Sequence, residues 1–243
     1  MRNLIIILLA TTLLGCNTSK NLTEDKVVIK TTPEIINTPL QIDFLKGMAH
    51  NHPSFAIWIE DLEGKYIETL FVTQYVAKGK FGHGEIEPGK WKNEPGVVRR
   101  PATLPYWAHK RNIKASDGLY VPSPETAVPD AISGPTPKGS FTLESGSKMK
   151  TGKFRILMEI NQPWDSNGFW TNNKFPGDRD YFASLQPALV YAVTLDLNAE
   201  EKEYYLNPIG HSHPSGKNGK LVTDISNHTT AKDIAERITV TLK

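Results

Sequence analysis

The chain reads Phe55-Ala56-Ile57-Trp58-Ile59-Glu60, then Asp61-Leu62-Glu63-Gly64-Lys65, then Tyr66-Ile67-Glu68-Thr69-Leu70-Phe71-Val72. The first part places apolar residues at every second position, which is the period of a strand that packs one face on a core. The middle part, with its Asp and Gly, is typical of a tight turn. Together the three parts predict a β-hairpin over residues 55–72.

The same two-residue period recurs along the rest of the chain. Apolar residues alternate with polar ones in residues 141–143, 154–160, 189–197 and 238–242. Each run predicts a strand that buries one face and exposes the other, as in antiparallel sheets. We therefore expect an all-β fold, an immunoglobulin-like antiparallel β-sandwich.

Signals for helices are few. One short C-terminal helix is predicted over Thr230–Arg237, with Thr229 or Thr230 as its cap. A turn or two of helix is expected within Leu104–Lys114, and a short strand at Val27–Ile29. Long connections decorate the sandwich at residues 79–105, 116–138 and 161–187, and connections of this length are usually functional.

The first residues are typical of an export signal. Arg2 precedes the apolar run Leu4–Leu14, which is shorter than the roughly 20 residues that cross a membrane. Leu13-Leu14-Gly15-Cys16 resembles a bacterial lipobox, in which the cysteine thiol receives a diacylglyceryl group. We expect a signal peptide at residues 1–15, a lipidated flexible tether at 16–40 and one β-sandwich domain at 41–243. An ordinary signal peptide followed by an unrelated cysteine is the alternative.

Lipidation of Cys16 would make the membrane the first partner of this protein. It would place the chain in the cell envelope, at the periplasmic face or at the outer membrane. The 28 basic and 26 acidic residues nearly balance, which argues against a nucleic-acid partner. Cys16 is also the only cysteine, so no disulfide can form within the chain and the hydrophobic core must supply its stability.

Four segments carry a resemblance to a known family. They are the hairpin from Phe55 to Leu70, the stretch Asp130–Leu143, the strand Phe154–Asn161 and the C-terminal part Thr229–Leu242. Together they resemble the bacterial predicted periplasmic proteins catalogued as domain of unknown function 2271. The resemblance implies an immunoglobulin-like sandwich and service to a membrane redox or uptake system. It implies no catalytic residue.

His211, Ser212, His213 and Pro214 form the sharpest local motif, and Asp224 follows them. Residues two apart on a strand point to one face, so His211 and His213 could reach one metal ion, with Asp224 as an oxygen ligand. A divalent metal is therefore the candidate cofactor. The spacing is similar to that of JAMM-type metallopeptidases, although Leu221 stands where those carry Ser. The alternative is a polar loop with two surface histidines.

A second His-x-His motif, His50-Asn51-His52, precedes the first strong strand. We interpret it as an exposed entry loop. Pairing with His211 and His213 in space is the alternative.

Aromatic residues concentrate in two loops. Trp107 and His109 lie in one of them, and Trp164, Asp165 and Trp170 lie in the other. Exposed Trp rings beside polar side chains are typical of carbohydrate binding, so these five residues are the candidate ligand-binding set. Packing of the same rings onto the sandwich is the alternative.

No catalytic residue is assigned from the sequence. It contains no Gly-x-Ser-x-Gly elbow and no Gly-x-x-x-x-Gly-Lys phosphate loop. The leading hypothesis is a lipid-anchored, non-enzymatic binding or accessory protein whose partner is an envelope protein or a glycan. The alternatives are a metal-binding protein or metal-dependent hydrolase using His211, His213 and Asp224, and a carbohydrate-binding lipoprotein.

Overall fold

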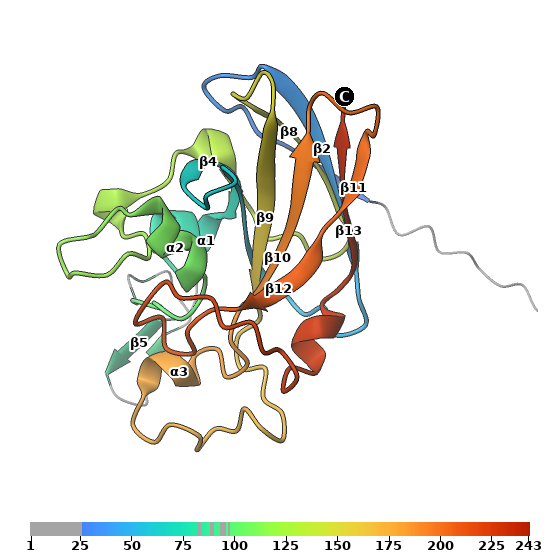
Figure 1. Ribbon diagram of the computed structural model, residues 1–243. Helices are drawn as coiled ribbons and strands as arrows, with labels where there is room; N and C mark the ends of the chain where they lie inside the picture. The colour runs from blue at the N-terminus through green and yellow to red at the C-terminus, as the bar shows by residue number, and fades with distance from the viewer. Residues whose placement is uncertain (1–25, 82–83, 88–89, 93–95, 97) are drawn as a thin grey trace, which may run out of the picture.

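Two β-sheets pack face to face in the computed structural model, which describes residues 26–81, 84–87, 90–92, 96 and 98–243 (Figure 1). The predicted signal peptide and Cys16 lie outside these residues. The first sheet has five strands in the order β1-β8-β2-β13-β11. In that order they are β1 (Val27–Lys30), β8 (Phe141–Ser147), β2 (Thr38–Lys46), β13 (Ala235–Leu242) and β11 (Glu203–Tyr205).

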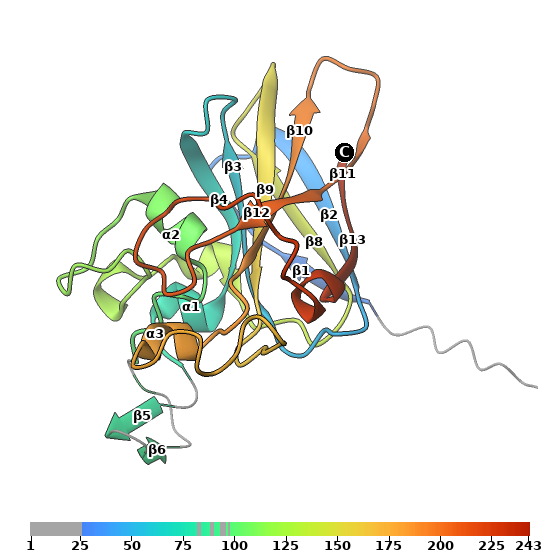
Figure 2. The same ribbon diagram turned by 60° about the horizontal axis from the view of Figure 1, so that its bottom comes forward.

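The second sheet has six strands in the order β12-β10-β9-β3-β4-β7. In that order they are β12 (Asn207–His211), β10 (Leu189–Asp196), β9 (Lys153–Asn161), β3 (Ser54–Glu60), β4 (Tyr66–Thr73) and β7 (Ser133–Gly134). A separate hairpin of β5 (Gly84–Glu87) and β6 (Lys90–Lys92) projects away from the sandwich (Figure 2). The predicted sandwich is confirmed, while its immunoglobulin-like topology stays a prediction.

The core between the sheets is built from the alternating residues that the sequence indicates. Phe44 of β2, Phe55 of β3 and Phe141 of β8 are fully buried, and their ring centroids lie 5.0–5.5 Å apart. Strands β2 and β8 belong to the five-stranded sheet and β3 belongs to the six-stranded sheet, so the aromatic cluster joins the two layers. Burial of such side chains contributes about 1.5–3 kcal/mol each.

The outer face of the six-stranded sheet is also covered, which the sequence analysis does not anticipate. Every residue of β3 after Ser54 is buried, including Trp58 on the face opposite Phe55. Helix α2 (Pro105–Arg111) lies against that face, with Tyr106 and Trp58 at a ring-centroid distance of 6.0 Å. Both faces of β3 are therefore buried: one face packs in the core between the sheets, and the other packs in a second core under α2.

The predicted C-terminal helix over Thr230–Arg237 does not form as an α-helix. Only a short 3₁₀ helix, η3 (Thr230–Asp233), forms, and β13 begins at Ala235. Ala235 pairs with Lys46 of β2 and Arg237 pairs with Leu45. Pairing with β2 satisfies these backbone groups and buries Ile238, which outweighs the helix propensity of the segment.

The remaining helices are short. The helix predicted within residues 104–114 is confirmed as α2. Two more, α1 (Gln74–Lys78) and α3 (Arg179–Phe182), carry no clear signal in the sequence. Two 3₁₀ helices, η1 (Pro124–Thr126) and η2 (Asp130–Ile132), lie in the connection before β7.

Residues 26–40 belong to the sandwich in the structure, whereas the sequence analysis expects a flexible tether up to residue 40. The short strand predicted at Val27–Ile29 is confirmed as β1, which runs parallel to β8. The Thr31 hydroxyl donates to Ser145 Oγ over 2.8 Å, and β2 begins at Thr38. The strand directions are therefore mixed, because the pair β4 and β7 is parallel as well.

Candidate functional site

The connection that carries α3 and the connection that follows β12 lie at the same end of the sandwich (Figure 1). His211 is the last residue of β12, and His213 lies beyond the strand. The two-residue period of a strand therefore does not apply to this pair. Each ring has its own set of neighbours.

The His211 ring packs among aromatic side chains. Its centroid lies 4.7 Å from that of His228 and 5.7 Å from that of Trp170. Its Nδ1 lies 2.7 Å from the Ser212 carbonyl oxygen, so Nδ1 carries the proton and donates. Burial lowers the pKa of His211, and the ring is neutral at pH 7.

The His213 ring has a different, partly charged environment. Its Nδ1 accepts from the Ser215 backbone N–H over 3.1 Å. Burial lowers the pKa of His213, and the nearby Lys217 and His109 lower it further while Asp178 opposes them. The charges of both neighbouring histidines, His109 and His211, act on His213.

Asp224 does not complete a ready-made metal site with the two histidines. Its side chain is exposed, and Oδ1 accepts from the Ser226 backbone N–H over 2.9 Å. Hydrogen bonds from Ser226 lower the pKa of Asp224, and His211 and His228 contribute in the same direction. In the part of the chain that the structure describes, no three His, Cys, Asp or Glu side chains lie close enough to hold a metal ion. The predicted trio is thus not assembled.

His50 and His52 do not join this end of the molecule. The His50 ring packs on Phe44 and Phe55, at centroid distances of 5.8 and 6.3 Å. His52 is exposed and adopts a positive φ of 52° in the turn before β3. The interpretation as an entry loop fits this placement.

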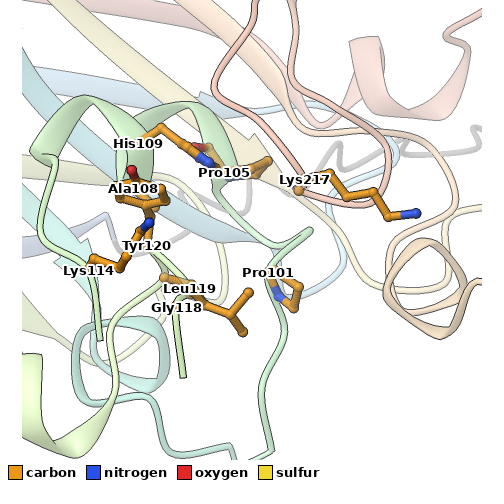
Figure 3. A pocket seen from close by; sticks show the side chains of 11 residues that line it. Pro101, Pro105, Ala108, His109, Lys114, Gly118, Leu119, Tyr120 and Lys217 are labelled. Carbon is orange, nitrogen blue, oxygen red and sulfur yellow. The ribbon is translucent and has the colours of Figure 1, made fainter. Parts of the chain in front are cut away.

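A pocket of about 220 Å³ lies between α2, the 114–121 loop and the 216–217 turn (Figure 3). His109 forms one wall, with Nδ1 donating to the Pro105 carbonyl over 2.8 Å and its ring 4.3 Å from that of Tyr120. Lys114 lies over Tyr120 at 5.1 Å. Figure 3 shows the Lys217 side chain pointing away from the other labelled residues, where it pairs with Asp178. The pocket is therefore small and largely lined by rings and backbone.

Glu159 is a fully buried carboxyl group beneath the first turn of α2. Its two oxygens accept from the backbone N–H groups of Tyr106 and Trp107, over 3.1 and 2.8 Å, in the first turn of α2. Burial raises the pKa of Glu159 to about 8, and these hydrogen bonds together with one from Ser212 only partly offset it. Glu159 therefore joins β9, α2 and the segment after β12.

Of the candidate aromatic residues, only Trp164 is exposed. Trp107 is buried in the second core, where its Nε1 donates to Thr69 Oγ1 over 3.0 Å. Trp170 is 6% exposed, whereas Trp164 is 49% exposed and adopts a positive φ of 56°. The packing alternative therefore holds for Trp107 and Trp170, and the ligand-binding hypothesis keeps Trp164.

Asp165 lies inside a polar network instead of facing a ligand. Its Oδ1 accepts from Thr230 Oγ1, and burial raises the pKa of the Asp165 carboxyl. Asn167 Nδ2 donates to Gln186 Oε1 over 3.0 Å and to the Asn227 carbonyl over 2.9 Å. This network fixes the 162–187 loop to the segment before η3.

The structure adds residues that the sequence analysis does not single out. Phe169, Phe175 and Phe182 lie on the same loop as Trp164 and are 40–46% exposed. His228 is 1% exposed and contacts His211. The three phenylalanines lie close together in a long loop of the sequence, which could have indicated an aromatic surface. The contact of His228 with His211, in contrast, depends on the path of the chain between them.

Among the described helices, none is long and apolar enough to cross a membrane. Comparisons of the chain with family models, with curated proteins and with solved structures give no match.

Proposed function

We propose that this protein is a lipid-anchored, non-enzymatic binding module of the cell envelope. It contacts an envelope protein through the aromatic loop surface, which consists of Trp164, Phe169, Phe175 and Phe182. In line with the family resemblance, the complex would serve a membrane redox or uptake system. One observation carries the proposal: four large aromatic side chains of a single loop are each 40–49% exposed.

The loop is held firmly enough to present these rings. Beneath it, Trp170, Tyr181 and Leu185 form a small core of their own. Phe175 packs on Tyr181 with a centroid distance of 4.8 Å. The backbone N–H of Trp164 donates to the Ala183 carbonyl over 3.3 Å. A preorganised aromatic surface loses little conformational entropy on binding, and clustered exposed apolar rings indicate an interaction site.

The chemistry of the surface favours a protein over a glycan. Recognition of a sugar needs accessible polar groups that can bind hydroxyls, and the side-chain oxygens of Asp165 and Asn167 near Trp164 are either hydrogen-bonded or buried. Asn167 Oδ1 accepts from the N–H groups of Phe169 and Trp170, and Asp165 is tied to Thr230. The exposed residues are mainly phenylalanines, which offer apolar area without hydrogen-bonding groups. Lys174, 3.3 Å from the Phe169 centroid, adds one positive charge.

Site-specific photocrosslinking in cells tests the surface. A benzoylphenylalanine at position 182 is expected to capture one discrete envelope protein. The same probe at position 205 should capture none, because Tyr205 is equally exposed, at 50%, but lies on β11 outside the loop. Equal capture at both positions would contradict the proposal. Retention on purified cell-wall glycan that is lost in Trp164→Ala, without a protein crosslink, would replace the protein partner by a glycan.

Fatty-acid labelling tests the anchor. Cells given an alkyne-tagged fatty acid are expected to label the wild-type chain and not the Cys16→Ser variant. The variant should also move from the membrane fraction to the soluble envelope fraction. Equal labelling of both chains would place the lipid at another residue, and absence of label from the wild-type chain would leave an ordinary exported protein.

A further inference from the structure

His211 and His228 come together from distant parts of the sequence. His211 ends β12, and His228 lies in the turn that precedes η3, where its N–H donates to the Ile225 carbonyl over 3.1 Å. Trp170 of the 162–187 loop covers both rings, with centroids 5.7 Å from His211 and 5.6 Å from His228. The three rings therefore form a closed triangle from three connections.

This triangle is buried, and several of its ring nitrogens have no hydrogen-bond partner. His211, His228 and Trp170 are 5%, 1% and 6% exposed. Both ring nitrogens of His228 and Nε1 of Trp170 lack a well-formed hydrogen bond, and the Pro187 backbone offers His228 only a partial contact. A buried polar atom without a partner costs about 1–3 kcal/mol, so several in one place indicate a binding function.

The His211 ring is already oriented as a ligand. Its Nδ1 donates to the Ser212 carbonyl, which leaves the lone pair of Nε2 available. A carbonyl that holds the second ring nitrogen is the usual support of a metal-binding histidine. Both ring nitrogens of His228 lack a hydrogen-bond partner, so the lone pair of this ring is available to an ion as well.

The distance between the rings fits a single ion. Two nitrogens bound at about 2.0–2.1 Å each lie at most about 4.2 Å apart. An ion about 2.1 Å from a ring nitrogen lies about 3.2 Å from the centroid of that ring. Centroids that are 4.7 Å apart can both lie at this distance from one ion, provided that each ring turns a nitrogen toward it. Asp224 adds a negative charge that acts on both rings from the exposed side, which favours a cation there.

We infer that His211 and His228 form a two-nitrogen site for a late first-row transition ion, copper or zinc, with the indole of Trp170 against it. Imidazole ligands suit these ions, and an aromatic face stabilises a cation. Water or Asp224 would complete the coordination. The site differs from the trio expected from the sequence, because His228 takes the place of His213. The inference does not rest on the proposed docking surface, although Trp170 also supports Phe169 of that surface at a centroid distance of 5.1 Å.

Metal titration of the full lipidated chain in detergent tests this inference. After treatment with chelator, the protein is titrated with Zn²⁺, with Cu²⁺, and with Cu⁺ under reducing conditions. Calorimetry and elemental analysis are expected to show one ion per chain for at least one of them. His211→Gln and His228→Gln should each weaken binding by more than about tenfold. His213→Gln and His52→Gln are the matched controls and should leave the affinity unchanged.

Two spectroscopic readouts keep the test decisive if a variant fails to fold. In the wild-type chain, substoichiometric Cu²⁺ should broaden the ring signals of His211 and His228 before those of the other histidines. Trp170→Phe should keep the ion but lose most of the tryptophan quenching by Cu²⁺. Absence of binding tighter than about 10 μM by every ion would overturn the inference. Loss of binding in His213→Gln with retention in His228→Gln would also overturn it and move the site to His213 and His109.

Discussion

At the residue scale, Glu159 makes the stability of the fold depend on pH. Its pKa is about 8 in the folded chain because burial disfavours the carboxylate, compared with 4.5 for an ordinary Glu. A folded-state pKa above the unfolded one means that the contribution of Glu159 is fully present below pH 4.5. It is then lost as the pH rises through 8, at up to about 1.4 kcal/mol per pH unit.

Glu159→Gln removes this titration. The melting temperature of the wild-type chain should fall more steeply between pH 5 and 9 than that of the variant, as measured by circular dichroism at several pH values. Glu144→Gln, an exposed carboxyl on β8, is the control and should keep the wild-type slope. Parallel pH profiles for wild type and Glu159→Gln would show that Glu159 does not titrate in this range.

Alanine substitutions at two glycines distinguish two losses of unfolding free energy, one caused by a left-handed backbone conformation and one caused by a steric clash. Gly118 and Gly216 have φ of 82° and 68°. A Cβ at Gly118 would meet no atom within 4 Å, whereas one at Gly216 would lie 2.1 Å from the Pro101 carbonyl oxygen. Gly118→Ala should cost about 1–2 kcal/mol for the left-handed conformation, and Gly216→Ala about 1–3 kcal/mol more for the clash. Urea unfolding measures both, and equal losses would contradict the close approach.

The sequence alone does not tell which loop tryptophans are buried and which histidines are in contact. Trp107 and Trp164 are both tryptophans in expected loops, yet one is core and the other is surface. The difference arises because α2 carries Trp107 onto the outer face of the six-stranded sheet. His228 is likewise apparent as a neighbour of His211 only after the connection from β12 to η3 has folded back.

At the scale of elements, β1 depends on few contacts. It is four residues long and, among the described strands, pairs with β8 alone. Thr31 continues it, and the Thr31 backbone N–H donates to the Glu144 carbonyl over 3.0 Å. Thr31→Pro removes that donor and the buried hydroxyl bond to Ser145. We expect faster hydrogen exchange and proteolysis within residues 26–37, and a loss of about 1–3 kcal/mol in unfolding free energy. Ile35→Ala, at an exposed position, should change neither.

Strands were predictable and one helix was not, for a physical reason. The runs 154–160 and 189–197 form β9 and β10 as predicted, although both faces of these strands are largely buried instead of one. The segment Thr230–Arg237 has helix-forming residues, but a helix there would break the pairing of Ala235 and Arg237 with β2. The pairing of β13 with β2 outweighs the local helix propensity, and a local sequence pattern does not reveal such a tertiary contact.

At the scale of the whole molecule, the aromatic cluster between the sheets stabilises the sandwich and the aromatic loop surface does not. Phe44→Ala removes a fully buried ring that contacts Phe55 and Phe141 and should cost about 3–5 kcal/mol. Phe182→Ala removes a ring that is 46% exposed and should change stability by no more than about 0.5 kcal/mol. Denaturant unfolding compares the two, and a large loss in Phe182→Ala would mean that this surface is part of the core.

The edge position of β1 would have a mechanical consequence under the proposed anchoring at Cys16. A pull on residue 26 acts on β1 before any other described strand, and β1 is an edge strand held on one side. Detachment of residues 26–37 would add about 40 Å of extended chain while the Phe44, Phe55 and Phe141 contacts stay intact. The sandwich would then keep its shape while its reach across the envelope lengthens under tension.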